Sequence, residues 1–305
     1  MKRIASMLTI TALSLPLGAQ NPPPRPKITG IHHVRLYVTN IEKSREFYGD
    51  IIGLPSASNR CADASRSCFA VSWGPKQQHV ELEQAPSPAP TDWLAEVAFV
   101  TNDVAAMRRY LLAHGIKVGA ISKDSNGAQH FELRDPEGNP IAFIERSGFT
   151  PIDDPPFSHA AGTRLFHAGF VVRDATVEDR FYRQLLGFSM YWHGGFKDTA
   201  TDWEEIQVPD GRDWIEYMLN IPSPADHKEL GVQNHFSLGV TNIKSAYDLL
   251  VTHGLKVTDD KPEIGRDGKW SFDIYDPDDT RVEFMEFKPV QKPCCHPYEA
   301  AHPTP

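Results

Sequence analysis

An internal repeat constrains the fold of this chain more than any other feature of its sequence. A strand-like segment that contains His33 is followed, fourteen positions later (47−33), by the pair Phe47-Tyr48 in a helix-like segment. The second half has the same arrangement, in which His167 precedes Phe181-Tyr182 by fourteen positions (181−167). A repeat on this scale is one supersecondary unit used more than once, so we expect a chain built from modules.

A second pair of segments is also repeated and alternates with the first pair. Glu96–Val100 leads to His114-Gly115, as His235–Val240 leads to His253-Gly254, and we interpret these histidines and glycines as helix ends. Both segments finish with a tight turn before a last strand, and these turns are Asp135-Pro136-Glu137-Gly138 and Asp276-Pro277-Asp278-Asp279. The order predicts an α+β fold of four βαβββ modules, joined in pairs into curved half-barrel sheets around a cleft.

The positions of the repeats divide the chain. Residues 148–163 are rich in Pro, Gly and Asp and are interpreted as a linker between two globular units. The expected organisation is a signal peptide 1–19, a Pro-rich lead 20–28, a first domain 29–147, the linker 148–163, a second domain 164–288 and a Cys- and Pro-rich tail 289–305.

The N-terminus has the pattern of an export signal. Lys2 and Arg3 precede an apolar stretch, and Gly18-Ala19 is a small-residue cleavage site. Polar residues and Pro16 interrupt the apolar stretch, which is shorter than the ~20 residues of a membrane span. We therefore expect a protein exported to the periplasm or the extracellular space, without a membrane span, acting as a monomer or homodimer.

Charge and cysteine content narrow the partners further. The formal net charge is −9 and no block of like charge occurs, so we expect a small-molecule substrate and no nucleic acid. In an oxidising compartment Cys61 and Cys68 are close enough in sequence to form a local disulfide. Cys294-Cys295 is interpreted as a redox-sensitive pair in a flexible tail, because vicinal cysteines lack the spacing of a zinc site.

These segments together resemble the vicinal oxygen chelate superfamily, which includes glyoxalase I, extradiol ring-cleavage dioxygenases, methylmalonyl-CoA epimerases and fosfomycin and bleomycin resistance proteins. The segments that carry the resemblance are HHV and FHAG on first strands, FYGDIIGL and FYRQLLGF after helices, and the Asp-Pro turns before last strands. The resemblance implies two glyoxalase-like domains that account for nearly all of the expected mature chain.

The resemblance also implies one metal site, in the second half. In that family the ligands lie on the first and last strands of two paired modules and face the cleft. The matching positions are His167, Glu216, His235 and Glu283, an order similar to that of bacterial-type glyoxalase I. Two imidazoles and one or two carboxylates on separate strands suit one Fe(II), Mn(II), Ni(II), Co(II) or Zn(II) ion and leave positions open to substrate.

The first half lacks part of this set. His33 and Glu81 match, but Glu96 replaces the second imidazole and Ala142 replaces the last carboxylate. The three remaining residues, His33, Glu81 and Glu96, could hold a weak second ion, although a structural or substrate-shaping domain is the preferred interpretation. Both interpretations assume that modules pair within each half, because crossed pairing would mix the two sets.

Strand alternation decides the roles of nearby residues. Glu145 lies three positions beyond the alanine, an odd step that turns it to the opposite face. His32 is expected to face away from His33 for the same reason. His79 is an even step from Glu81, so phase does not exclude it, but neither His32 nor His79 is assigned a role.

Three functions are compatible with the resemblance. The first is a glyoxalase-like lyase or isomerase that acts on a small vicinal-oxygen substrate through a metal-bound enediolate, with Glu216 and Glu283 moving protons. The second is an Fe(II)- or Mn(II)-dependent dioxygenase, although the family's second-sphere His near Trp214 and Tyr near Asp273 are missing. The third is a non-catalytic binder of the resistance type. An aromatic loop around Tyr191 is a further candidate for lining the cavity, and the proposed substrate-contacting residues are Tyr191, His193, Trp203 and Trp214.

Overall fold

The computed structural model shows that each half of the chain forms its own mixed sheet, so the modules pair within a half and not across halves. The structure describes residues 23–57, 61, 63, 65–72, 77–124, 127–145, 159–256 and 261–305. The expected signal peptide and most of the expected linker lie outside these residues. Among the described residues no helix has the length and apolar character needed to cross a membrane.

Domain 1 is a seven-stranded sheet in the order β2-β3-β1-β4-β7-β6-β5. Its strands are β1 (Ile28–Val38), β2 (Ser67–Ser72), β3 (Gln78–Gln84), β4 (Leu94–Thr101), β5 (Ser122–Lys123), β6 (Gln129–Arg134) and β7 (Pro140–Glu145). Its helices are α1 (Ile41–Arg45), which continues as the π-helical turn η1 (Glu46–Ile51), and α2 (Val104–Ala113). The first strands of the two modules, β1 and β4, are antiparallel neighbours and join the modules into one sheet.

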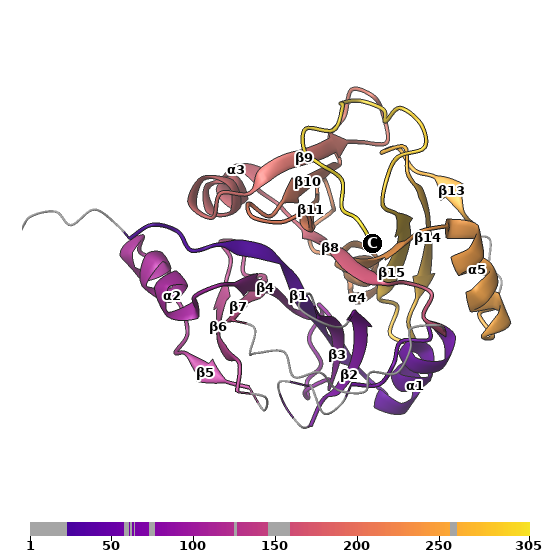
Figure 1. Ribbon diagram of the computed structural model, residues 1–305, viewed down its shortest axis with the longest axis horizontal. Helices are drawn as coiled ribbons and strands as arrows, with labels where there is room; N and C mark the ends of the chain where they lie inside the picture. Colours follow the sequence, from indigo (N-terminus) through magenta and orange to yellow (C-terminus); the bar gives the residue numbers. More distant parts are fainter. Residues whose placement is uncertain are drawn as a thin grey trace, which may run out of the picture.

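Domain 2 repeats this arrangement as an eight-stranded sheet in the order β13-β14-β15-β12-β8-β11-β10-β9. Its strands are β8 (Arg164–Val171), β9 (Ser189–Gly194), β10 (Trp203–Gln207), β11 (Trp214–Met218), β12 (His235–Val240), β13 (Glu263–Ile264), β14 (Trp270–Tyr275) and β15 (Arg281–Glu286). Its helices are α3 (Ala175–Asp179), which continues as η5 (Arg180–Leu185), α4 (His227–Gln233) and α5 (Ile243–Thr252). The curled sheets and few helices confirm the predicted α+β fold (Figure 1).

The module helices start and stop as their sequences indicate. Asn40, Asp103, Asp174 and Asn242 stand at the N-caps, and each side chain accepts a hydrogen bond from a backbone N–H of the first turn. His114 and His253 are the C-cap residues of α2 and α5, as predicted. Glu145 accepts a hydrogen bond from the backbone of α2, which confirms that it faces away from the cleft.

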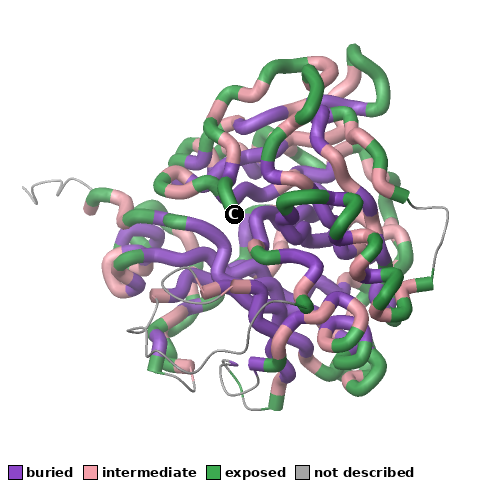
Figure 2. The backbone as a smooth tube through the Cα atoms, turned by 45° about the vertical axis from the view of Figure 1, so that its right-hand side comes forward, coloured by how far each residue is buried: buried purple, intermediate pink, exposed green. Residues whose placement is uncertain are grey.

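The repeated Phe-Tyr pairs and Asp-Pro turns bind the two domains together. The hydroxyl of Tyr48 in domain 1 donates to Asp276 Oδ2 of domain 2 at 3.0 Å, and Tyr182 of domain 2 donates to Asp135 Oδ2 of domain 1 at 3.2 Å. One apolar core extends through both domains, and Figure 2 shows buried backbone continuing where the halves meet. The sequence hallmarks of the repeat are therefore residues of the domain interface.

The C-terminal tail is packed on domain 2, so the expectation of a flexible tail was wrong. The tail runs across the domain 2 sheet (Figure 1) and is fixed by polar and ring contacts. Trp192 Nε1 donates to the carbonyl of His296 at 3.1 Å, and the rings of Tyr191 and Tyr298 have centroids 4.8 Å apart. Its Pro-rich composition suggested flexibility and did not show that Tyr298 packs on Tyr191 of the sheet. Both cysteine pairs form disulfides, including the predicted Cys61–Cys68.

Candidate metal centre

The four predicted ligands of the second half converge on one point. They come from four adjacent strands, β15, β12, β8 and β11. His167 Nε2 lies 3.1 Å from His235 Nε2 and 3.0 Å from Glu283 Oε2, while Glu216 Oε2 lies 3.2 Å from His235 Nε2. Two further distances, from His167 Nε2 to Glu216 Oε2 and from His235 Nε2 to Glu283 Oε2, are both 4.0 Å.

The donor set fits a divalent metal ion. Two ligand atoms that bind one ion at about 2.1 Å can lie no more than about 4.2 Å apart. The five distances above are 3.0–4.0 Å, so these ligand atoms are close enough together to bind the same ion. His167, His235 and Glu283 form a group whose ligand atoms all lie within 4.8 Å of one another, and Glu216 stands beside His235.

Burial keeps both imidazoles neutral and therefore able to bind a cation. Burial lowers the pKa of His167 to about 3 and lowers the pKa of His235 well below its ordinary value. The same burial raises the pKa of Glu283 to about 7. His235 Nδ1 donates to the carbonyl of Gln233 at 2.8 Å, which leaves the Nε2 lone pair directed at the other ligands.

The walls of the centre come from residues next to the ligands on the same strands. Trp214 is paired with His167 in the sheet, and its ring stacks on that imidazole with centroids 5.0 Å apart. Gly169 is paired with His235, and a Cβ at this position would lie 2.2 Å from the imidazole Cε1. Only a glycine therefore leaves room for His235. The Glu216 and Glu283 side chains are 13% and 11% exposed, against 1% or less for the imidazoles, so the centre opens on its carboxylate side.

The family model of the Glyoxalase/Bleomycin resistance protein/Dioxygenase superfamily matches the chain twice, at residues 30–143 and 164–284. The chain belongs to this superfamily.

Solved structures of superfamily dioxygenases share the fold. The substrate complex of homoprotocatechuate 2,3-dioxygenase from Brevibacterium fuscum has a TM-score of 0.64 and 21% identity, covering 87% of this chain and 82% of that one. The 2,3-dioxygenase LapB from Pseudomonas sp. KL28 has a TM-score of 0.66 and 16% identity, covering 92% and 96%. The homoprotocatechuate 2,3-dioxygenase from Arthrobacter globiformis has a TM-score of 0.65 and 21% identity, covering 87% and 82%. No curated protein sequence matches the chain.

Two basic residues near the proposed metal ligands, Arg281 and Lys269, were not identified from sequence. Arg281 Nη2 lies 2.9 Å from His235 Nε2, and its Nη1 lies 3.4 Å from Asp273 Oδ2. Arg281 precedes Glu283 by two positions on β15, so strand alternation was a signal that could have placed it on the same face. Lys269 is fully buried, and its Nζ lies 4.7 Å from the centroid of the Trp214 ring.

The proposed substrate-contacting residues lie at different distances from the centre. Trp214 contacts a ligand directly, and Tyr191 packs behind it with ring centroids 4.8 Å apart. The His193 ring stacks on that of tail residue His296 at 3.6 Å, and Trp203 packs on Phe196. Tyr191 and His193 belong to strand β9 and not to the loop that was expected, because this segment pairs along β10.

Domain 1 fills the equivalent place with an ion pair. Arg35 stands where domain 2 has Gly169, and it is paired in the sheet with Glu96, which stands where domain 2 has His235. Arg35 Nη2 lies 3.3 Å from Glu96 Oε2, so domain 1 has an ion pair at the positions that Gly169 and His235 hold in domain 2. The structure places Glu96 next to His33, and Glu81 next to His79.

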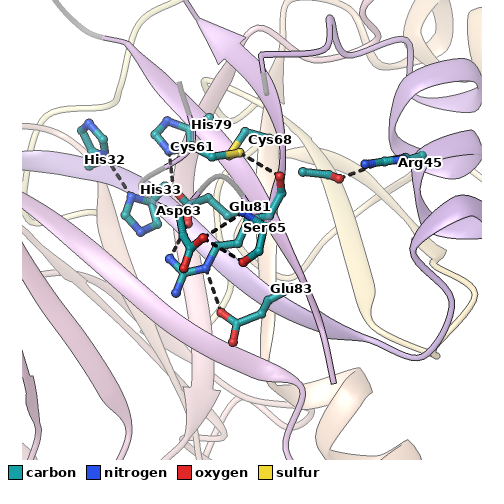
Figure 3. Close-up of a disulfide and its surroundings, with 12 residues drawn as sticks. His32, His33, Arg45, Cys61, Asp63, Ser65, Cys68, His79, Glu81 and Glu83 are labelled. Carbon is teal, nitrogen blue, oxygen red and sulfur yellow. Dashed lines mark hydrogen bonds and ion pairs between the residues drawn. A yellow bond between two sulfur atoms is a disulfide. The ribbon is translucent and has the colours of Figure 1, made fainter. Parts of the chain in front are cut away.

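Strand alternation failed at His32. The pairing of β1 with β4 shifts between Ile31 and His33, so a β-bulge interrupts the alternation at this point. His32 Nδ1 consequently lies 2.8 Å from His33 Nδ1, although the two were expected on opposite faces. His79, which was left unassigned, joins both rings (Figure 3).

Proposed function

We propose that domain 2 is a mononuclear metal enzyme that binds a small substrate through two adjacent oxygens and oxidises it with dioxygen. The observation that carries this proposal is the convergence of His167, His235 and Glu283. A face of two histidines and one carboxylate with open positions is typical of non-haem Fe(II) oxygenases. Fe(II) or Mn(II) bound here would supply a Lewis acid with adjacent open positions for a chelating substrate.

The substrate class that we propose is an aromatic diol. One structure that shares the fold holds 3,4-dihydroxyphenylacetate, a compound with two adjacent hydroxyl groups. That likeness concerns the fold, so the substrate is part of the proposal. The indole of Trp214 forms an apolar wall beside His167, and the Arg281 guanidinium places a positive charge beside His235, where an ionised diol would be stabilised.

Glu216 is the residue that we propose to take the proton from the substrate hydroxyl. Its Oε2 lies 3.2 Å from His235 Nε2 and 4.0 Å from His167 Nε2, and its side chain is partly exposed on the open side. A carboxylate here would be within reach of a substrate oxygen bound to an ion held by the two histidines. His167, His235 and Glu283 are sufficient to hold the ion without it.

The same residue supports a second candidate, a glyoxalase-like lyase or isomerase. A second carboxylate next to the two-histidine face can act as a fourth ligand that leaves the ion and moves a proton between adjacent carbons. Such an enzyme needs no oxygen and uses Ni(II), Co(II) or Zn(II). Oxygen dependence and metal preference therefore separate the two candidates.

The deciding experiment loads the mature protein anaerobically with Fe(II), Mn(II), Ni(II), Co(II) or Zn(II) in separate samples. We expect oxygen uptake with 3,4-dihydroxyphenylacetate or related diols in the Fe(II) or Mn(II) sample only. His235→Ala should abolish the uptake, whereas His130→Gln, a histidine on β6 bonded to Ser122, should leave it unchanged. Turnover of hydroxycarbonyl adducts without oxygen would establish the lyase instead, and tight binding without turnover would establish a binder.

Glu216→Gln tests the proton transfer separately from metal binding. The variant should keep its metal but lose ~10²-fold or more in rate, the usual scale for a general base. Metal content by elemental analysis and rate on the same sample give both quantities. A wild-type rate in the variant would remove Glu216 from the reaction.

A further inference from the structure

Domain 1 contains a second cluster of histidines, which the metal centre of domain 2 does not use. The rings of His32, His33 and His79 have centroids 5.1, 4.9 and 4.9 Å apart. One nitrogen of each ring lies within 4.8 Å of the others. All three side chains are buried, and Figure 3 shows them grouped beside Glu81.

We propose that these three imidazoles bind a second divalent ion of the zinc type. Nitrogen ligands lie 2.0–2.1 Å from Zn²⁺ in a tetrahedral site, which places the centroids of neighbouring imidazole rings about 5 Å apart. The observed separations agree with that value. The inference is independent of the reaction proposed for domain 2, because no residue is shared.

Two carboxylates hold the rings by their far nitrogens. His33 Nε2 lies 3.1 Å from Glu96 Oε1, and His79 Nε2 lies 2.9 Å from Glu81 Oε1. An imidazole that donates from Nε2 presents the lone pair of Nδ1, and this carboxylate–histidine arrangement is typical of metal ligands. The two glutamates predicted as ligands are thus better placed to orient the rings than to bind the ion.

One of the presented nitrogens is left without a partner. His79 Nδ1 is buried and accepts no hydrogen bond from the residues that the structure describes. A buried polar atom without a partner costs about 1–3 kcal/mol, so such an atom calls for an explanation. A bound cation provides one. The Nδ1 atoms of His32 and His33 are 2.8 Å apart and would have to move apart only slightly to bind the same ion.

The charges around the cluster favour neutral nitrogen ligands. Arg35 Nη2 lies 3.3 Å from the second oxygen of Glu96, and Arg66 Nη1 lies 3.2 Å from the second oxygen of Glu81. Each carboxylate is therefore shared between an imidazole and an arginine. Cys68 also lies near His79, but its sulfur is in a disulfide and cannot act as a thiolate ligand. Three neutral imidazoles suit Zn²⁺ or Cu²⁺ better than Mn²⁺ or Mg²⁺.

The test uses the full mature chain with the domain 2 centre disabled by His235→Ala and Glu283→Ala. Titration with Zn²⁺ against a chelating indicator, without reductant so that both disulfides persist, should give about one ion per chain. Adding His79→Gln should remove this ion. His130→Gln is the matched control, because it removes a histidine of the same domain outside the cluster and should leave the stoichiometry unchanged.

Glu81→Gln provides a second arm that keeps all three imidazoles. Arg66 retains Glu83 as a partner at 2.8 Å, so the substitution does not isolate the arginine. Loss of the orienting carboxylate should weaken Zn²⁺ binding 10–100-fold, a typical second-shell effect. Three results would each overturn the proposal. The first is a disabled chain that binds no Zn²⁺, the second is an unchanged Zn²⁺ affinity in Glu81→Gln, and the third is an equal loss of bound Zn²⁺ in His79→Gln and His130→Gln. Circular dichroism of every variant excludes unfolding as the cause, and Glu81→Gln decides alone if His79→Gln does not fold.

Discussion

Gly169→Ala should disable the metal centre without replacing any of the proposed ligands. The new Cβ would lie 2.2 Å from Cε1 and 2.5 Å from Nδ1 of His235. Carbon atoms in contact prefer about 3.5–4.0 Å, so the imidazole must retreat by about 1.5 Å. Metal–ligand distances tolerate about 0.2 Å, so His235 is lost as a ligand. We expect metal affinity to fall at least ~100-fold, the upper end of what even an indirect second-shell change causes.

The assay is elemental analysis after gel filtration, followed by competition with a chelator to obtain the affinity. Gly239→Ala is the matched control, because it lies on the same strand as His235 and its Cβ would meet Phe287 Cε1 at 2.4 Å. Both variants should lose about 1–3 kcal/mol of unfolding free energy by overpacking, but only Gly169→Ala should lose metal. Wild-type metal affinity in Gly169→Ala would refute the argument that the glycine makes room for the ligand.

Three further predictions concern the interface and the compartment. Burial, with Asp135 nearby, raises the pKa of Glu178 from 4.5 to about 8, so stability should fall as pH rises from about 4.5 to 8, and Glu178→Gln should flatten that fall in urea unfolding at several pH values. Tyr48→Phe removes the donor to Asp276 and should cost about 1–3 kcal/mol of unfolding free energy without changing metal content. Mass spectrometry without reductant should find exported protein starting after Ala19 with Cys61 and Cys68 linked; free thiols there would contradict export.

The repeat allowed the fold to be predicted because its members agree in register. A helix start, a Phe-Tyr pair and an Asp-Pro turn recur at equal spacings, and each has a local cause in capping, burial or turn geometry. The same register placed His167 and His235 on the first strands of their modules, which are antiparallel neighbours in the sheet. The purpose of the recurring tyrosines was not readable, because their partners lie in the other domain.

The prediction for His32 failed because it depended on how β1 pairs with its neighbour. Alternation assumes an unbroken ladder, and one bulge next to His32 reverses the face of that residue. Sequence alone also did not show which residues pair across strands. Arg35 and Glu96 form a pair in domain 1 at the positions where Gly169 and His235 form a pair in domain 2. Each substitution alone is unremarkable in sequence. Only their pairing across two strands shows that an ion pair in domain 1 stands where domain 2 has a glycine and a histidine.

Contacts between the domains give domain 1, which lacks the expected ligand set, a structural role in domain 2. Gln78, next to His79 on β3, accepts from the backbone N–H of Leu165 at 3.1 Å and donates to its carbonyl at 2.5 Å. Leu165 lies two positions before His167 on β8, so domain 1 fixes the strand that carries a proposed metal ligand of domain 2. Asp213, directly before Trp214, accepts from the backbone of Ile31 at 2.9 Å and fixes β11 in the same way. A ligand strand held at its start by the other domain loses its position if that domain is removed. The first domain therefore helps to hold the strands of the candidate metal centre in place.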